Sequence, residues 1–230
     1  ARADQHDRDA TFPLESYEEM KASGYAHMTL PKRFGGEDVD LLELCACEEQ
    51  LAQGCAGTTL GVNMHIFGVG ALLHDAQNAT PDRQAQIEMM LSLVATSKAI
   101  VCGSFSETSQ AGAYFLPATK ATRVDGGWQI NGVKSYNSNF PAADLVGASV
   151  HFLDHPDGAH MVGMVLLPTG SPGVTSLGAE SWDVLGVRAS GSYDVQFTDA
   201  FVPDAMVAPA VPASEALFRG MEAFLAWFNL

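Results

Sequence analysis

The spacing of apolar residues divides the chain into a helical first part and a strand-rich second part. Up to about residue 97, apolar side chains recur three or four positions apart, as at Leu14, Tyr17 and Met20, and this spacing predicts helices. Residues 58–73 are apolar on nearly every face, which predicts a buried helix. After Lys98 the apolar runs become short and are separated by glycine and proline, a pattern typical of strands.

Local signals predict where two helices begin. Residues 32–40 read as a loop, and Asp38 or Asp40 at its end can cap the helix that follows. Thr80-Pro81-Asp82 offers a capping hydroxyl, a proline at the first helical position and an acid near the positive end of the helix dipole. We therefore expect helices from about residues 41 and 81.

Glycine-containing turns organise the second part. Asp125-Gly126-Gly127 and Asn131-Gly132 both predict hairpins, because tight turns of this kind need positive φ angles. The resulting fold class is α+β, with an all-helical region followed by a β-barrel or sandwich. The predicted strands are residues 99–105, 121–124, 128–130, 144–152, 161–167, 174–177 and 193–197.

The character of the chain changes again from about residue 203. The segment SEALFRGMEAFLAWFNL contains helix formers and is hydrophobic almost all round, so it needs either a partner or further protein to cover it. We favour further protein. The expected domains are 1–97, N-terminal helical; 98–208, middle β-domain; and 209–230, the start of a truncated C-terminal helical domain.

Composition narrows the possible partners. The chain has 230 residues, 47% of them apolar, and a formal net charge of −15. An acidic protein lacks the basic face that nucleic acids require, so nucleic acid is not an expected partner. The opening residues ARADQHDRDA show no signal-peptide pattern, and no uninterrupted apolar run reaches membrane-spanning length, which predicts a cytoplasmic protein.

Cysteine and histidine residues give no metal-binding pattern. The cysteines form no CxxC pair and are expected to be buried free thiols. His151, His155 and His160 are closely spaced, but a His-Pro-Asp-Gly turn interrupts them, which predicts solvated loop side chains and no metal. The four cysteines are Cys45, Cys47, Cys55 and Cys102.

Residues 128–139, WQINGVKSYNSN, carry unusual polarity for a strand. Short hydroxyl and amide side chains surround one aromatic residue, Tyr136, where a core strand would have apolar groups. Taken alone, Ser135 and Ser138 are better explained by exposure to water, and Tyr136 by packing across strands. The segment gains meaning only in combination with others.

Four segments in order resemble the acyl-CoA dehydrogenase family. PLESYEEMKASGYAHMTLPKRFGGEDVD is similar to the family's opening helix and its Pro-x-x-x-Gly-Gly turn, and WQINGVKSYNSN to its Trp-x-Ile-Asn-Gly-x-Lys-x-Trp-Ile-Thr-Asn segment. SFSETSQAG resembles Thr-Glu-Pro-x-Ala-Gly-Ser, and LGVRASGSYDVQFTDAFVP resembles Met-Gly-x-Arg-x-Ser followed by Val-x-Phe-x-Asp-Val-x-Val-Pro. The resemblance covers the family's N-terminal helical and middle β-domains.

The resemblance implies FAD as cofactor and assigns residues to its flavin ring. Phe105 and Ser106 would meet the pyrimidine end, and Ser138 would hydrogen-bond near N5. Tyr136 takes the place of a tryptophan that shields the ring. Hydroxyls and amides in these positions stabilise the charge that a reduced flavin develops. The complete set of expected cofactor-binding residues is Phe105, Ser106, Gly112, Tyr136, Asn137 and Ser138.

Departures from the family pattern keep a second reaction open. Thr108 replaces the proline after Glu107, and Ala113, the expected substrate contact, stands where the family has a serine near the thioester. Tyrosine at 136 and asparagine at 137 make the site more polar. The leading hypothesis is α,β-dehydrogenation of an acyl-CoA with hydride transfer to flavin N5, and the alternative is a flavin-dependent monooxygenase of the same fold.

The family's catalytic base is not assigned. It usually lies in a C-terminal helical domain, and neither Glu215 nor Glu222 has a motif that supports the role. We therefore expect this chain alone to be inactive. The resemblance also implies an electron-transfer partner for a dehydrogenase, fatty acid metabolism and a homo-oligomer formed through the missing helical domain. A third hypothesis is a non-catalytic subunit that binds a partner through its apolar tail.

Overall fold

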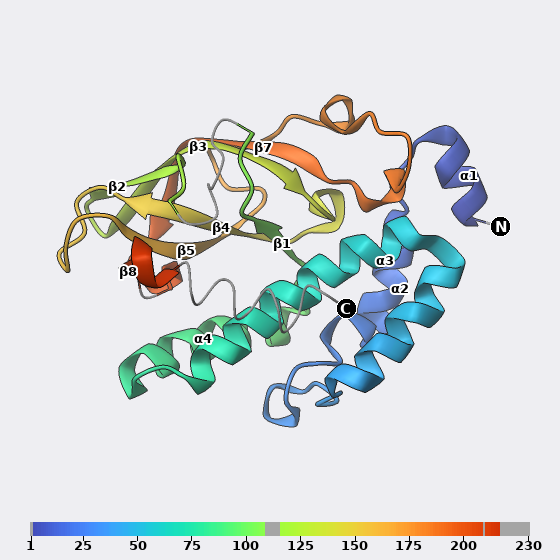
Figure 1. Cartoon of the computed structure of the whole chain (residues 1–230), viewed down its shortest axis with the longest axis horizontal. Coiled ribbons are helices and arrows are strands. Elements are labelled where there is room, and N and C mark those ends of the chain that lie inside the picture. The colour runs from blue at the N-terminus through green and yellow to red at the C-terminus, as the bar shows by residue number, and fades with distance from the viewer. Residues whose placement is uncertain (1, 109–115, 209, 217–230) are drawn as a thin grey trace.

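Helices come first along the chain and strands follow (Figure 1). The computed structural model describes residues 2–108, 116–208 and 210–216. The apolar tail after residue 216 lies outside this range. The predicted α+β fold class is confirmed.

The α-helices are α1 (Arg2–Asp9), α2 (Leu14–Ser23), α3 (Leu41–Gln77) and α4 (Pro81–Ser97). The strands are β1 (Val101–Ser104), β2 (Lys120–Val124), β3 (Gly127–Asn137), β4 (Leu145–Phe152), β5 (Met161–Pro168), β6 (Val174–Ser176), β7 (Tyr193–Pro203) and β8 (Val211–Pro212).

The predicted capping interaction is present at the start of α3 but not at the start of α4. Asp40 accepts a hydrogen bond from the Glu43 backbone N–H, and the Glu43 carboxylate accepts one from the Asp40 N–H. Asp40, rather than Asp38, therefore caps α3. Pro81 opens α4 as predicted, but the Thr80 side chain makes no capping hydrogen bond. The fixed φ of the proline is sufficient to start that helix.

Helix α3 has 37 residues and changes direction at Cys55, whose φ of −161° and ψ of 102° are not helical. After this break the helix is buried almost continuously, which confirms the buried helix predicted for residues 58–73. By length and composition α3 could also cross a membrane, although no such stretch was expected from the sequence. However, 67% of that stretch is buried inside the protein, as is common for the core helix of a globular domain.

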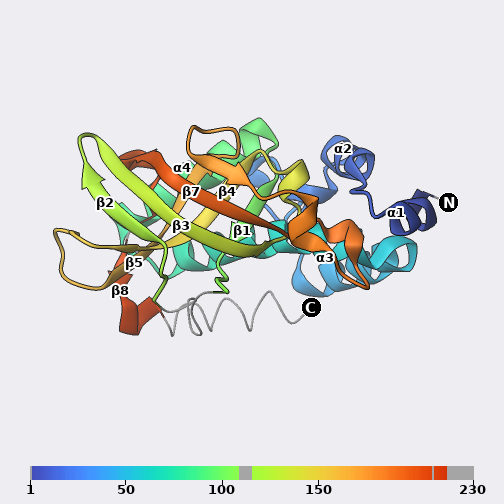
Figure 2. The same ribbon diagram turned by 90° about the horizontal axis from the view of Figure 1, so that it is seen from above.

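The strands form one strongly curled sheet (Figure 2). Its order is β6-β7-β3-β2-β4-β5-β8, and β1 pairs in parallel with β4 outside this path. The longest strands, β3 and β7, pair antiparallel. Side chains from both arms of the curl enclose one apolar core, which includes Trp128, Phe152 and Phe197.

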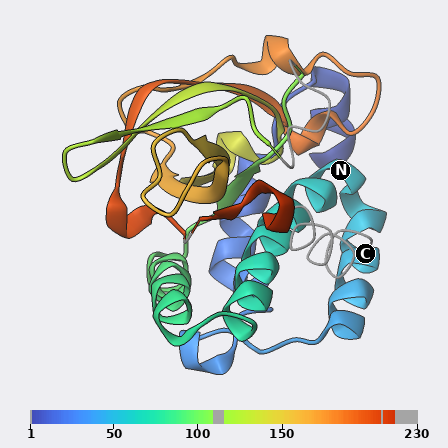
Figure 3. The ribbon, with the colours of Figure 1, turned by 60° about the vertical axis from the view of Figure 1, so that its left-hand side comes forward.

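A second core joins the helices to the sheet (Figure 3). Leu72 and Leu73 of α3 pack with Leu91 of α4, Val101 of β1 and Leu166 of β5. Two turns earlier in α3, His65 links three segments, because its ring bonds to the Ala26 carbonyl and to the Val101 N–H. The helical part is therefore packed directly on the first strand of the sheet.

The hairpin predicted at Asn131-Gly132 is wrong. Strand β3 continues through these residues, and its register against β7 shifts between Ile130 and Gly132. The Asn131 amide donates to the Asp199 carboxylate at 3.0 Å and accepts from the Asp199 N–H at 2.9 Å. Pairing with a distant strand therefore makes this a β-bulge. The other predicted hairpin, at Asp125-Gly126, is confirmed, because β2 pairs with β3 across it.

Two histidine and cysteine predictions also need correction. His155 is not solvated: its ring stacks on Trp128, with centroids 5.8 Å apart. The His151 and His160 rings stack on each other at 5.6 Å. Among the described residues, no group of three or more His, Cys, Asp or Glu side chains is arranged to hold a metal. Of the four free cysteines, one is buried, Cys102; the others are partly exposed, Cys45, Cys47 and Cys55.

The Gly35-Gly36 turn supports a prediction on stability. A Cβ on Gly36 would lie 2.0 Å from the Leu30 carbonyl oxygen, whereas one on Gly35 would meet nothing within 4 Å. Gly36→Ala must therefore move backbone, and we expect it to lower the free energy of unfolding by about 1–3 kcal/mol. Gly35→Ala is the control, since its only penalty is a φ of +82°, about 1 kcal/mol. Urea denaturation measures both; equal losses would contradict the steric explanation.

Candidate functional site

Two polar segments far apart in sequence lie side by side at the end of β1. The Ser135 N–H donates to the Ser106 carbonyl at 2.9 Å, and the Lys134 ammonium donates to the Phe105 carbonyl at 3.2 Å. The Ser104 hydroxyl completes the junction by donating to the Asn137 side-chain oxygen at 2.5 Å. Residues 104–106 are thereby held against residues 134–137.

A buried ion pair lies behind this junction. The Lys134 ammonium is 2.8 Å from the Glu107 carboxylate, and both side chains are fully buried. Glu107 also accepts hydrogen bonds from the Ala118 N–H, the Thr119 N–H and the Thr119 hydroxyl, at 2.7, 2.9 and 2.7 Å. The Lys134 ammonium further contacts the Ser149 hydroxyl at 3.1 Å. The pair fixes Glu107, and with it the adjoining residues 105 and 106, against β3.

Glu107 stays ionised in this environment. Burial by itself would raise its pKa, but the hydrogen bonds from Lys134 and Thr119 outweigh burial and lower the pKa below the usual value. Burial lowers the pKa of Lys134, and the Glu107 carboxylate opposes that change. The site therefore contains a buried ion pair, in which the ammonium and the carboxylate each have hydrogen-bond partners within the protein.

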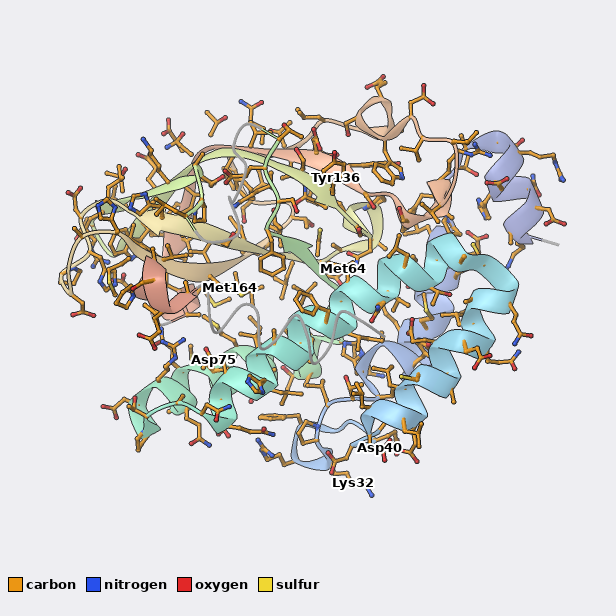
Figure 4. All side chains as sticks on the ribbon, in the orientation of Figure 1. Lys32, Asp40, Met64, Asp75, Tyr136 and Met164 are labelled. Carbon is orange, nitrogen blue, oxygen red and sulfur yellow. The ribbon has the colours of Figure 1, made fainter. Side chains whose placement is uncertain are left out.

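Aromatic rings border the junction on two sides. Tyr136 is 57% exposed, with a φ of +60°, and its ring meets the Trp182 ring edge-on with centroids 6.1 Å apart. Phe105 is half-buried and packs edge-on against Phe67 of α3, with centroids 6.0 Å apart. Figure 4 shows Tyr136 away from α3, while Met64 lies on α3, where it faces the sheet. Tyr136 therefore offers an accessible aromatic surface.

Polar atoms without partners lie close to this aromatic surface. The Ser135 hydroxyl and the Trp182 indole nitrogen are buried and have no hydrogen-bond partner among the described residues. Buried polar atoms are normally paired, so unpaired ones often mark the place of a missing ligand or water. Ser106, by contrast, is exposed. The residues present therefore fit a planar ligand with hydrogen-bonding edges.

Asn137 and Ser138 turn into the protein. The Asn137 amide is fully buried, and its nitrogen donates to the Lys134 and Tyr193 carbonyls at 2.9 and 2.7 Å. The Ser138 hydroxyl is 7% exposed and lies 2.8 Å from the Ser192 hydroxyl. Asn137 thus holds neighbouring segments together with all its groups engaged, and Ser138 lies at the edge of a buried hydroxyl network.

An apolar cavity of about 20 Å³ lies between the sheet and the two longest helices. Phe105 borders it from the end of β1, Leu72 from α3, Met90 from α4 and Met164 from β5. Figure 4 shows Met164 on this inner side of the sheet. Space of this size accommodates about one water-sized group.

The described residues bring together five of the predicted ligand contacts. Phe105, Ser106, Tyr136, Asn137 and Ser138 share one neighbourhood, held together by the hydrogen bonds above. The remaining two, Gly112 and Ala113, lie outside the described residues, as does Glu222.

Sequence reasoning overlooked four residues of this neighbourhood. Glu107 and Lys134 are the Glu and Lys of the two motifs SFSETSQAG and WQINGVKSYNSN, so those motifs already contained the signal for the ion pair. Ser190 and Ser192 lie in a third motif, LGVRASGSYDVQFTDAFVP, but that motif gave no sign of their contact with Ser138, which only the fold brings about.

The first part of the chain matches a known family. Residues 1–84 match the family model "Acyl-CoA dehydrogenase, N-terminal domain". Putative acyl-CoA dehydrogenase YdbM of Bacillus subtilis (strain 168) is 26% identical over 204 residues, which are 88% of this chain and 51% of that protein. The match therefore continues from the helices into the strands.

Other similar proteins are not named as acyl-CoA dehydrogenases. L-evernosamine nitrososynthase of Micromonospora sp. (strain ATCC 39149 / NRRL 15099 / SCC 1413) is 30% identical over 203 residues, 86% of this chain and 45% of that protein. The solved structure of KijD3 in complex with FMN and dTDP-3-amino-2,3,6-trideoxy-4-keto-3-methyl-D-glucose has a TM-score of 0.79 and 25% identity, and the similarity covers 98% of this chain and 56% of that one. The chain spans about half the length of the relatives it matches.

Proposed function

Because this chain is a relative of the acyl-CoA dehydrogenase family, we propose that it forms the flavin-binding part of an oxidoreductase that acts on a small polar substrate. The observation that carries the proposal is the junction of residues 104–106 with residues 134–138, which combines an exposed aromatic ring with unpaired polar atoms. The KijD3 structure, at 25% identity, contains FMN on the same fold. FAD, the cofactor typical of the family, and FMN are both candidates for this chain.

Some residues of the junction would contact the flavin, and others hold those residues in place. Tyr136 would cover one face of the flavin ring, and Ser106 and Ser138 would face its polar edge. Asn137, Glu107 and Lys134 hold these residues in place and have no free hydrogen-bonding group for a ligand. A bound flavin supplies the electron-transfer chemistry, and the chain's preorganised donors stabilise the negative charge that reduction creates.

The most similar relatives favour a monooxygenase over a fatty acyl-CoA dehydrogenase. The similarity to L-evernosamine nitrososynthase and to KijD3 supports a small nitrogen-containing substrate, such as an amino sugar nucleotide. In this reading the enzyme would use reduced flavin and oxygen.

Dehydrogenation of a short acyl-CoA is the second candidate. It is supported by the match of residues 1–84 to the acyl-CoA dehydrogenase model and by the similarity to YdbM. This reaction would require a catalytic base beyond the residues assigned here, and an electron-transfer partner. A cytoplasmic location and a homo-oligomer are part of both proposals.

One experiment separates the two reactions. The full-length product of the gene that encodes this chain is expected to bind FAD or FMN and to be yellow. With a flavin reductase, NADH and oxygen, it should oxidise an amino sugar nucleotide, while acyl-CoA thioesters leave the flavin oxidised. Bleaching of the flavin by a short acyl-CoA under anaerobic conditions would establish the dehydrogenase instead. A protein that binds neither flavin would contradict both candidates.

A further inference from the structure

Three serines form a chain of hydrogen bonds that leads inward from the candidate site. The Ser138 hydroxyl lies 2.8 Å from the Ser192 hydroxyl, which lies 2.7 Å from the Ser190 hydroxyl. Their exposed fractions fall along the chain from 7% to 2% and 0%. The Ser138 end therefore lies nearest the surface, beside Tyr136, and the Ser190 end lies in the interior.

Backbone contacts hold the three hydroxyls in register. The Asn139 N–H, next to Ser138, donates to the Ser190 carbonyl at 2.8 Å, and the Ser190 N–H donates to the Val187 carbonyl at 2.9 Å. Arg188 supports the same turn, since its guanidinium donates to the Leu185 carbonyl at 2.9 Å. The turn before β7 thus places Ser190 and Ser192 next to Ser138, which follows β3.

An acceptor bound beside Ser138 would set the direction of this chain. Three hydroxyls carry three hydrogens, but two hydrogen bonds connect them, so one hydrogen is left for another acceptor. Among the described residues, Ser138 and Ser190, at the two ends, each have Ser192 as their side-chain hydrogen-bond partner. A buried O–H without an acceptor is unfavourable. With an acceptor beside Ser138, Ser190 would donate to Ser192, Ser192 would donate to Ser138, and the remaining hydrogen would be on Ser138.

We propose that Ser190 and Ser192 are positioning residues that orient the Ser138 hydroxyl as a hydrogen-bond donor to an acceptor atom on the edge of the flavin ring. The inference rests on the flavin-binding function proposed above. Ser138 is expected near N5, which accepts a hydrogen bond in oxidised flavin and becomes an N–H donor on reduction. A donor fixed there would therefore favour the oxidised form, unlike donors at the pyrimidine end of the ring, which stabilise the charge of the reduced form.

The test compares variants of the full-length gene product loaded with FAD. Ser192→Ala is expected to weaken binding of oxidised FAD about three- to tenfold, the range of one lost hydrogen bond, with little change for reduced FAD. The midpoint potential of the bound flavin should then rise by about 15–30 mV, since a tenfold change corresponds to about 30 mV for two electrons. Ser192→Thr keeps the hydroxyl and should restore the wild-type potential. Ser190→Ala should have a smaller effect than Ser192→Ala.

A matched control separates positioning from stability. The Thr59 hydroxyl is likewise buried and donates to the Cys55 carbonyl within α3, so Thr59→Ala removes a structural hydrogen bond that is not part of the serine chain. It should lower stability without moving the flavin potential. A Ser192→Ala potential equal to that of the wild type, or an equal shift in Ser192→Thr, would overturn the inference while the flavin site stands. A wild-type protein that binds neither FAD nor FMN overturns the proposed function as well.

Discussion

Lys134→Met is expected to lower the free energy of unfolding by about 3–5 kcal/mol, because it leaves a buried carboxylate without its cation. Glu107 would keep its hydrogen bonds from Ala118 and Thr119 but lose the ammonium at 2.8 Å. Methionine matches the length of the lysine stem, so the loss reports the charge and not a cavity. Urea denaturation at neutral pH measures the change.

The exposed pair between Arg123 and Asp204 provides the control for Lys134→Met. Its guanidinium and carboxylate are bonded through two contacts on the surface, with about half of each side chain exposed. Water and salt screen such pairs, so Asp204→Asn should change stability far less than Lys134→Met does. Similar losses in the two variants would show that the buried pair is not a structural anchor of the site.

The importance of this pair lies in where it is placed. Glu107 follows Phe105 and Ser106 directly, and Lys134 precedes Ser135 and Tyr136. The ion pair therefore holds together the two segments that supply the proposed flavin contacts. Joining two segments by a buried ion pair makes the fold sensitive to the loss of either partner, because the remaining buried charge would lower the free energy of unfolding. It also allows little variation in the relative position of the segments.

Short-range signals in the sequence were sufficient for much of the fold. Asp40 and Glu43 satisfy each other's backbone groups three residues apart, so the start of α3 can be recognised locally. The buried second half of α3 and the Asp125-Gly126 hairpin are similarly local. Asn131-Gly132 carries an equally good local signal, but the partner that decides its conformation is Asp199, on another strand. Here tertiary pairing overrides the turn preference.

The same distinction applies to the candidate site. The motifs around Ser106 and Tyr136 pointed to two segments that the structure brings together, because a resemblance carries long-range information that composition lacks. The hydroxyl chain was not predicted, since Ser138 and Ser192 are 54 residues apart and lie in two different motifs, and the motifs themselves do not show that the two side chains meet. The small size of the apolar cavity also depends on the packing of Leu72, Met90 and Met164 from three different elements.

Acid is expected to destabilise the protein through His65, a residue outside the candidate site. Its ring is fully buried; one nitrogen lies 2.9 Å from the Ala26 carbonyl, and the other accepts a hydrogen bond from the Val101 N–H at 3.0 Å. A proton on the accepting nitrogen would face the Val101 N–H. Burial, reinforced by the nearby ring of His27, lowers the pKa of His65 to about 3.

The direction of the pH effect follows from where the proton binds. In the unfolded chain His65 has the ordinary histidine pKa of about 6.5, so between about pH 6.5 and pH 3 the unfolded state binds a proton that the folded state does not. The stabilisation is thus complete above pH 6.5 and is lost as the pH falls. The contribution of this single group is at most about 1.4 kcal/mol per pH unit, or about 2 kcal/mol between pH 7 and pH 5.

His65→Gln isolates this contribution, because glutamine can still donate to Ala26 and accept from Val101 but does not titrate. Other groups affect both proteins equally; Glu48, whose pKa burial raises to about 7, is one that acts in the opposite direction. Urea denaturation from pH 7 to pH 5 should therefore show the wild type losing about 2 kcal/mol more than the variant does. Parallel curves would mean that the proton enters the folded protein as easily as the unfolded chain. The link from α3 to β1 would then depend on packing and not on a neutral imidazole.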